Sequence, residues 1–146
     1  ILHLLKVIPE TKKILYLQPT SPLREIKDIL NIIELQDKHN AESCISISKA
    51  PKHPSWMYKL DSYKKINPIF SEEKAFRRQD LSEVYVINGA LYLGNSEFYK
   101  REKKFINDET LGYIMPKERS IDIDDMDDWM LAEFKLRMKI ESKSKK

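Results

Sequence analysis

Glycine and cysteine are scarce in this sequence, and their scarcity excludes several classes of protein. Only three glycines occur among 146 residues, and none belongs to a glycine-rich loop of the kind that holds a triphosphate with backbone amides. Cys44 is the only cysteine, which rules out an internal disulfide and favours a reducing compartment, the cytoplasm. Within the alternating segment 43–47 this thiol is expected to be a small buried side chain and not a nucleophile.

Concentrated charge and long apolar runs are also lacking. The formal net charge is only +3, and the lysines are scattered up to the C-terminal stretch 135–146, so no nucleic-acid partner is expected. The apolar run at the N-terminus is broken by Lys6 and ended by Pro9, which makes it too short to span a membrane. With 41% hydrophobic and 34% charged residues, the chain is expected to form a globular fold.

The first fifty residues follow a strand, helix, strand order. A continuous apolar run over 14–17 predicts a strand buried on both faces, and a proline turn ends it. Helical spacing predicts a helix over 23–39, and residues 42–48 predict a second strand. This order is typical of an α/β fold, in which functional loops lie at the carboxyl ends of the strands, where Gln18 is found.

Two predicted helices have an apolar face. In the helix over 23–39 the charged residues, Asp28 among them, are expected to face solvent. Its apolar positions are Ile26, Ile29, Leu30 and Ile33. A second helix is predicted from Met126 to about residue 141. The residues repeating on one of its faces are Trp129, Ala132, Leu136 and Ile140.

Residues 51–82 differ from the rest of the chain, because prolines interrupt them and their aromatic residues follow no core pattern. Residues 56–60 predict one arm of a hairpin. The expected organisation is therefore an α/β core of residues 1–50 and 83–141, an excursion over 51–82 and a basic tail over 142–146. The aromatic residues of the excursion need cover, which either a partner subunit or the chain's own core would supply.

The second half predicts a strand over 84–93, a short helix over 96–104 and a short strand over 112–115. The strand over 84–93 is interrupted by Asn88 and Gly89. A glycine at such a place permits a bulge or the close approach of a ligand.

Alternating carboxylates follow at Asp122 and Asp124. If residues 120–124 are a strand, its period of two places both carboxylates on one face and the intervening isoleucines in the core. Magnesium prefers oxygen ligands and usually takes one or two protein carboxylates, leaving other positions for water and phosphate. In an alternative interpretation, Asp124 or Asp125 caps the following helix. The two interpretations are compatible, since one aspartate can cap while its neighbours hold metal.

Four segments of the chain, taken in order, carry a family resemblance. They are Leu17–Arg24, Arg77–Leu81, Asn88–Tyr92 and Ser120–Asp124, the last followed by Asp128-Trp129 and Ala132-Glu133. On these segments the chain resembles the acylneuraminate cytidylyltransferases, also called CMP-sialic acid synthetases. The resemblance covers nearly the whole chain but includes nothing that matches the family's N-terminal CTP-binding loop, so it implies a C-terminal part that does not form a complete CTP pocket or an active enzyme alone.

The resemblance implies a three-layer, mostly parallel, Rossmann-like nucleotidyltransferase sheet with helices on both faces. It also implies a homodimer in which the 51–82 excursion crosses between subunits. The implied reaction is attack by the anomeric hydroxyl of a nonulosonic acid on the α-phosphorus of CTP, with release of pyrophosphate. A sugar-binding or dimerisation module of the same fold that performs no catalysis is the alternative function.

The resemblance also implies roles for charged residues. Asp122 and Asp124 would hold Mg²⁺ against the phosphates. Arg78 corresponds to an arginine near the substrate, where a guanidinium can bind a carboxylate or phosphate through two hydrogen bonds, although a surface salt bridge is its alternative role. The chain departs from the family at Ser82, where proline is common. It also departs after His53-Pro54, where Lys59 is displaced and receives no role.

On the sugar side the resemblance implies five contacts. Gln18 would exchange hydrogen bonds with hydroxyl or N-acyl groups, or else close the following turn. Asn88 and Gly89 would shape the strand beside the pocket, and Asn88 would also contact a sugar hydroxyl. Tyr92 and Phe105 would line the pocket with apolar surface for an N-acyl methyl group, or else be ordinary core residues.

Overall fold

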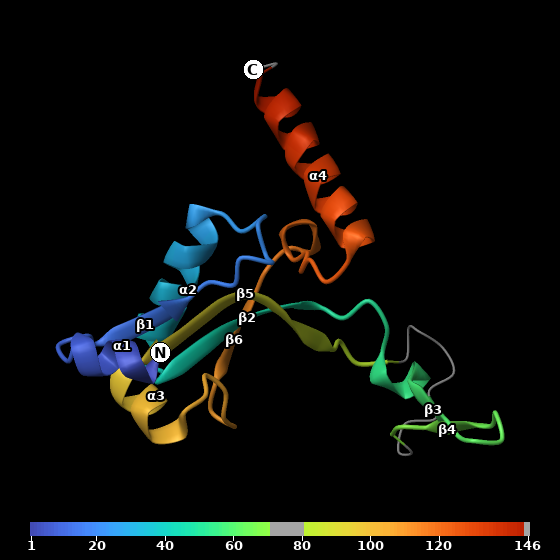
Figure 1. Ribbon diagram of the computed structural model, residues 1–146, viewed down its shortest axis with the longest axis horizontal. Coiled ribbons are helices and arrows are strands. Elements are labelled where there is room, and N and C mark those ends of the chain that lie inside the picture. Colours follow the sequence, from blue (N-terminus) through green and yellow to red (C-terminus); the bar gives the residue numbers. More distant parts are fainter. Residues whose placement is uncertain (71–80, 145–146) are drawn as a thin grey trace. The chain divides into compact units, whose positions relative to one another are not determined.

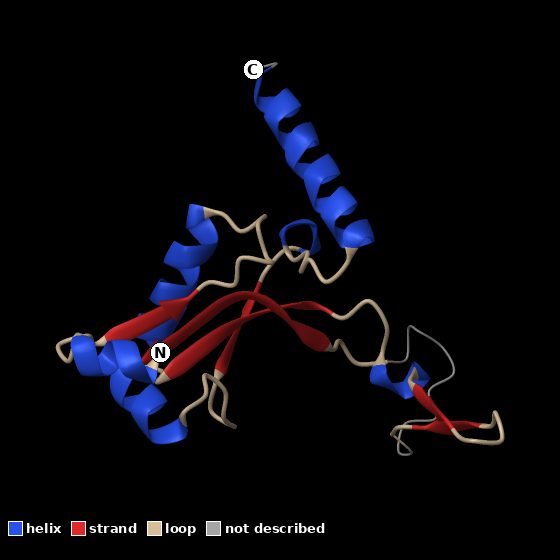
Figure 2. Ribbon diagram, in the orientation of Figure 1, coloured by secondary structure: helices blue, strands red, loops and turns tan. Residues whose placement is uncertain are grey.

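The computed structural model describes residues 1–70 and 81–144. The chain divides into two compact units, one of Ile1–Ser48 with Ile87–Lys146 and one of Lys49–Val86. Figures 1 and 2 show the elements, which in chain order are α1 (Leu2–Val7), β1 (Lys13–Tyr16), α2 (Ile26–His39), β2 (Ser43–Lys49), the 3-10 turn η1 (Pro54–Trp56), β3 (Tyr58–Leu60), β4 (Ile66–Pro68), β5 (Tyr85–Asn95), α3 (Ser96–Glu102), β6 (Leu111–Ile114), the 3-10 turn η3 (Lys117–Arg119) and α4 (Met126–Ser144).

The main sheet has four strands in the order β1-β5-β2-β6. β1 runs antiparallel to β5, with Tyr16 opposite Tyr92, whereas β2 and β6 run parallel. The α/β class is therefore confirmed, and the sheet is mixed, with both antiparallel and parallel pairs. The three-layer, mostly parallel nucleotidyltransferase arrangement stays a prediction.

One face of the sheet is covered by α2. Ile32 of this helix is fully buried and packs with Leu91 and Leu93 of β5, Met115 and Cys44. These residues form the main core cluster. Burial raises the pKa of the Cys44 thiol to about 11, which confirms the expectation of an unreactive buried cysteine.

The face of α2 that contacts the core agrees with the predicted one in part, because Ile29 and Ile33 are partly buried and pack against the core cluster as predicted. Ile26 and Leu30 remain 76% and 60% exposed, whereas Asp28, expected in solvent, is fully buried. The physical reason is an ion pair between Asp28 and Arg119, which turns the helix so that Ile32 and not Leu30 enters the core. Because Arg119 is 91 residues away along the chain, helical periodicity alone could not reveal this pair.

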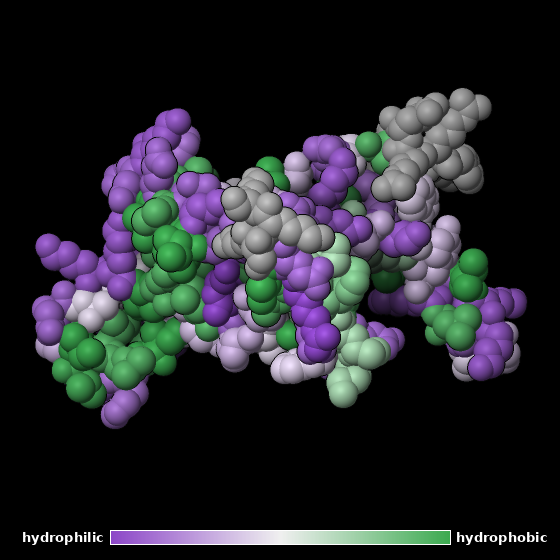
Figure 3. Space-filling view, turned by 90° about the horizontal axis from the view of Figure 1, so that it is seen from above, coloured by the Kyte–Doolittle hydropathy of each residue, from purple (hydrophilic) through white to green (hydrophobic). Residues whose placement is uncertain are grey.

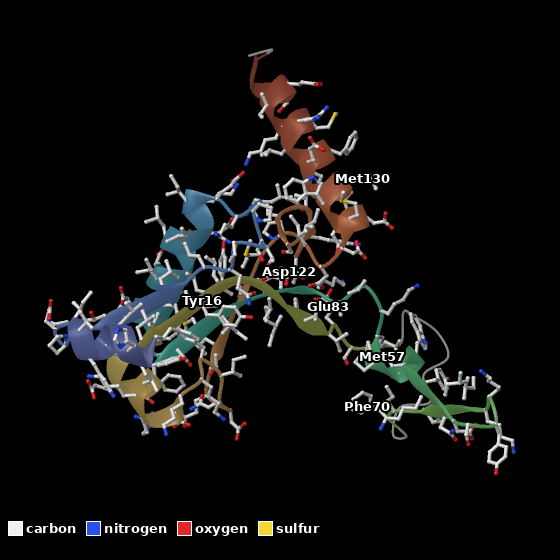
Figure 4. All side chains as sticks on the ribbon, in the orientation of Figure 1. Tyr16, Met57, Phe70, Glu83, Asp122 and Met130 are labelled. Carbon is white, nitrogen blue, oxygen red and sulfur yellow. The ribbon has the colours of Figure 1, made fainter. Side chains whose placement is uncertain are left out.

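The last helix is also longer and less buried than predicted. Its apolar repeat contacts the core only at Ala132, which packs with Leu23 and Ile121, while Trp129 and Leu136 stay 55% and 45% exposed. Figure 1 shows α4 extending away from the sheet, and Met130, labelled in Figure 4, is 54% exposed. An ion pair from Lys139 to Glu25 ties the helix to the start of α2.

The unit Lys49–Val86 contains the predicted hairpin, formed by the antiparallel strands β3 and β4. Its apolar side chains are largely exposed, with Tyr63 at 83%, Ile66 at 66% and Leu60 at 62%. Exposed apolar side chains also gather on α1, at the left of Figure 3. The predicted cover for the hairpin, by a partner subunit or by the chain's own core, stays a prediction. None of the described helices is long and apolar enough to cross a membrane.

The packing of α2 can be tested by comparing Ile32→Ala with Leu30→Ala. Ile32 is fully buried, so its truncation should lower the free energy of unfolding by about 2–5 kcal/mol. Leu30 is 60% exposed, so its truncation should cost less than about 0.5 kcal/mol. Urea unfolding followed by circular dichroism measures both values. Equal losses for the two variants would contradict the observed orientation of the helix.

Candidate functional site

Three segments far apart in the sequence meet at Gly89. A Cβ atom on this residue would lie 2.5 Å from Oε1 of Gln18 and 2.7 Å from Oδ2 of Asp122. The backbone of Gly89 has φ of +73°, a conformation that side chains other than glycine rarely adopt. β5 continues through this position without the predicted interruption. Glycine therefore allows the loop after β1 and the segment before α4 to approach one strand closely.

The carboxylate of Asp122 is half-buried beside Ser21. The Ser21 hydroxyl lies 3.4 Å from Oδ1 of Asp122 and 3.3 Å from the carbonyl oxygen of Asn88. Burial raises the pKa of Tyr92, and the negative charge of Asp122 raises it further. Asp122 thus lies close enough to the aromatic side of the sheet for its charge to act there.

Asn88 is buried and hydrogen-bonded on both ends of its amide. Its Oδ1 accepts a hydrogen bond of 2.6 Å from Ser46, and its Nδ2 donates one of 2.9 Å to Ser120. Ser120 in turn donates to the carbonyl oxygen of Pro116 at 2.9 Å. This arrangement ties β2, β5 and the segment that carries Asp122 together. The predicted contact between Asn88 and a sugar hydroxyl stays a prediction.

The segment 120–124 forms no strand. Its one backbone hydrogen bond to a neighbouring segment runs from the amide of Ile123 to the carbonyl oxygen of Thr20, at 2.9 Å. The two isoleucines nevertheless enter the core as predicted, because Ile121 is buried and Ile123 is half-buried in the second core cluster. A shared face for Asp122 and Asp124 stays a prediction. A ladder is missing because β6 ends at Ile114 and a 3-10 turn intervenes.

The aspartates around the start of α4 form different hydrogen bonds. Oδ1 of Asp125 accepts a hydrogen bond of 3.0 Å from the amide of Asp128, which confirms that this residue caps the helix. Oδ2 of Asp128 accepts one of 3.2 Å from the amide of Asp124. Among the described residues, the side chains of Asp122 and Asp124 take no part in this cap.

The donor set decides which metal fits. Within residues 1–70 and 81–144, no group of three or more His, Cys, Asp or Glu side chains is arranged to hold a metal ion. A structural zinc ion, which needs four protein ligands, therefore does not fit this part of the chain. A donor set of one or two carboxylates is the kind that magnesium accepts, because this ion completes its shell with water and substrate phosphate.

The rings of Tyr16, Tyr92 and Phe105 pack together beside the polar residues Gln18 and Asp122, and we call these three rings the aromatic wall. Tyr92 lies 5.8 Å from both Tyr16 and Phe105, measured between ring centroids, and Tyr16 stacks on Phe105 at 6.2 Å with an interplanar angle of 9°. Phe105 is buried, with Tyr99 behind it at 4.8 Å. Tyr16 is 41% exposed and Tyr92 is partly exposed, so these two rings present the accessible surface of the wall.

Gln18 uses its backbone and its side chain differently. Its carbonyl oxygen closes the turn by accepting hydrogen bonds from the amide of Ser21 at 3.3 Å and from Nη1 of Arg24 at 2.6 Å. The side-chain amide lies next to Gly89 and makes no hydrogen bond to any described residue. The two predicted roles are therefore compatible, since the turn needs only the backbone.

Sequence reasoning missed Tyr16, Ser21 and Asp28 at this site. Tyr16 ends β1 and stands two residues before Gln18, a spacing that period-2 analysis of the sequence could have used. Ser21 and Asp28 depend on contacts across 101 and 91 residues and had no local signal. Arg78, predicted to bind substrate, lies outside the described residues.

The fold and the site define an α/β protein with a carboxylate-bearing polar site beside the carboxyl end of β1. The chain is 36% identical over 121 residues to an N-acylneuraminate cytidylyltransferase of Streptococcus agalactiae serotype V, covering 83% of this chain and 29% of the relative. It is 32% identical over 131 residues to the N-acylneuraminate cytidylyltransferase of Escherichia coli O18:K1:H7, covering 89% and 31%.

A CMP-N,N'-diacetyllegionaminic acid synthase of Legionella pneumophila is 30% identical over 123 residues, covering 82% of this chain and 52% of the relative. No family model matches the chain. The resemblance seen in the sequence is nevertheless confirmed: the chain is homologous to one segment of the acylneuraminate cytidylyltransferases. It spans 29–31% of the length of the two N-acylneuraminate cytidylyltransferases.

The close approach at Gly89 predicts a specific cost for Gly89→Ala. The new methyl group would meet Gln18 and Asp122 and would require a strained backbone, so the free energy of unfolding should fall by about 2–4 kcal/mol. Gly112→Ala is the control: its methyl group would meet only the flexible end of Ile47, so its cost should be under about 1.5 kcal/mol. Urea unfolding compares the two. An equal cost would contradict the convergence of segments at Gly89.

Proposed function

We propose that this chain forms the metal-binding and acceptor-binding side of a cytidylyltransferase site that activates a nonulosonic acid with CTP. The observation that carries the proposal is the convergence of Gln18, Gly89 and Asp122 in a chain homologous to N-acylneuraminate cytidylyltransferases. CTP and the acid are the proposed substrates, and Mg²⁺ is the proposed cofactor. A homodimer is the proposed assembly, with the exposed hairpin of Lys49–Val86 in the interface.

In the proposed reaction the anomeric hydroxyl of the acid attacks the α-phosphorus of CTP. A new oxygen–phosphorus bond forms, the bond to the β-phosphate oxygen breaks, the hydroxyl loses its proton and pyrophosphate leaves. Mg²⁺ would neutralise the charge that develops on the phosphates. Asp122 and Asp124 would hold the ion, and Ser21 would orient the carboxylate of Asp122 through the contact at 3.4 Å.

The acceptor would lie between the polar group and the aromatic wall. The Gln18 amide can both donate to and accept from hydroxyl or N-acyl groups. The exposed rings of Tyr16 and Tyr92 offer apolar surface on the same side of the sheet. Phe105, buried behind them, would support the wall without touching the acceptor. Such a pocket pairs a few placed polar groups with apolar lining, as small-molecule sites commonly do.

The reaction and the metal ligands are tested together by pyrophosphate release. The full-length gene product is incubated with CTP, Mg²⁺ and a panel of nonulosonic acids. Asp122→Asn and Asp124→Asn should each lower turnover roughly a hundredfold or more, because several kcal/mol of charge stabilisation are lost. Pyrophosphate release is measured with a coupled phosphate assay, and circular dichroism confirms that each variant is folded.

Asp127→Asn is the matched control, because Asp127 is exposed in the first turn of α4 and lies on the same acidic stretch. It should keep turnover within about threefold of the wild type, as surface substitutions usually do. No release with any acid from folded protein would contradict the proposal and would favour a non-catalytic sugar-binding or dimerisation module. Full activity in Asp122→Asn and Asp124→Asn would contradict the proposal that these two carboxylates hold Mg²⁺.

The aromatic wall predicts an acceptor-specific effect of Tyr16→Ala. Loss of the exposed ring should raise KM for the acid about threefold to tenfold, equivalent to about 0.7–1.4 kcal/mol of apolar contact, and leave KM for CTP unchanged. Tyr16→Phe should keep both values near those of the wild type if only the ring makes contact. Steady-state kinetics with each substrate varied in turn measures the effect. An equal rise in both KM values would place Tyr16 outside the acceptor pocket.

A further inference from the structure

A buried ion pair lies behind the segment that carries the two proposed metal ligands. The Asp28 carboxylate, fully buried, accepts hydrogen bonds from Nε and Nη2 of Arg119 at 2.9 and 2.7 Å. The Tyr113 hydroxyl donates to the same carboxylate at 3.1 Å, and the amide of Glu25 donates at 2.8 Å. One carboxylate therefore joins β6, the start of α2 and the 3-10 turn that ends at Arg119.

Arg119 is placed to transmit this anchorage to the site. It stands three residues before Asp122, and the next residue, Ser120, is held by Asn88 at 2.9 Å. Beyond Asp122, the amide of Ile123 is bonded to Thr20, and Asp125 caps α4. Asp122 therefore lies within a short stretch that is anchored at Arg119 and Ser120 on one side and at Ile123 on the other.

We propose that the Asp28–Arg119 ion pair is a positioning device that sets the placement of the Asp122 and Asp124 carboxylates for the divalent metal ion. This inference rests on the proposed function. Arg119 and Asp28 are positioning residues. Their charged groups contact each other, and they influence the metal ligands only through the polypeptide chain between them.

The geometry of the pair favours positioning over stability. A buried ion pair is often no more stabilising than apolar residues of the same volume, because removing both charges from water is costly. A two-pronged guanidinium–carboxylate contact does, however, fix direction as well as distance. Metal ligands need such support, because changing the groups that hold the ligands commonly lowers metal affinity about tenfold to a hundredfold.

The chain offers a matched control in the ion pair between Arg101 and Glu42. It has the same two-pronged form, with contacts of 3.3 and 2.6 Å from Nη1 and Nη2 of Arg101. Both side chains are about half exposed, at 52% and 46%, and they join α3 to the start of β2. Arg101→Lys thus removes an equivalent contact that has no connection to the segment 120–124.

The experiment compares Arg119→Lys, Asp28→Asn and Arg101→Lys in the full-length gene product. Mn²⁺ affinity is measured in the presence of CTP from the electron paramagnetic resonance signal of the free ion, which needs no turnover. We expect Arg119→Lys and Asp28→Asn to weaken Mn²⁺ binding about tenfold or more. Arg101→Lys should leave the affinity within about twofold, because surface ion pairs contribute little.

Kinetics supplies the second measurement. In Arg119→Lys the Mg²⁺ concentration that gives half-maximal pyrophosphate release should rise by the same factor as the Mn²⁺ dissociation constant, and saturating Mg²⁺ should restore most of the rate. A purely structural role would instead lower the folded fraction, and with it the rate at every metal concentration. Thermal unfolding of each variant separates the two effects.

Tyr113→Phe keeps the proposal testable if the stronger variants do not fold. It removes one hydrogen bond to Asp28 but keeps the ion pair, and it should weaken Mn²⁺ binding about threefold. Unchanged Mn²⁺ affinity in every folded variant, or an equal loss in Arg101→Lys, would overturn the positioning role. The proposed function would be overturned instead if the wild-type protein bound Mn²⁺ with CTP but released no pyrophosphate with any acid. In that case the Mn²⁺ affinities of the variants would still decide whether the ion pair positions the metal ligands.

Discussion

The buried charge of Asp28 is the constraint on which much of this structure depends. Burial by itself would raise the pKa of this carboxyl, but the hydrogen bonds from Arg119 and from the amide of Glu25 outweigh burial and hold the pKa below its usual value. The folded state therefore favours the ionised form. The resulting stabilisation is present at neutral pH and is lost as the pH falls through the lowered pKa.

Buried hydrogen bonds between distant segments also organise the candidate site. Asn88 forms hydrogen bonds with Ser46 and Ser120, and these bonds hold three segments together. The Gln18 amide and the Asp122 carboxylate face the space beside Gly89 instead. Side chains that support and side chains that can meet a ligand are thus different residues. Such a division suits a site that has to keep its ligands in place while substrates enter and leave.

Much of the local structure could be predicted from the sequence. Helices and strands follow from apolar spacing, and their order predicted an α/β fold that the structure confirms. The buried Cys44, the cap at Asp125 and the hairpin at β3 and β4 were also expected. Among the predictions that differ from the structure are part of the buried face of α2, where Asp28 and Ile32 replace Ile26 and Leu30, and the strand at 120–124. In both, contacts with distant residues outweighed the local pattern.

The sequence by itself determined which segments are extended or helical, and its motifs indicated the family, because spacing and motif are local properties of a chain. Only the tertiary structure decided that β5 runs antiparallel to β1, that Gln18 and Asp122 meet at Gly89, and that Asp28 is buried against Arg119. These features join residues that are 33 to 104 positions apart. Their energies come from desolvation and pairing in the folded state, which no short window of sequence contains.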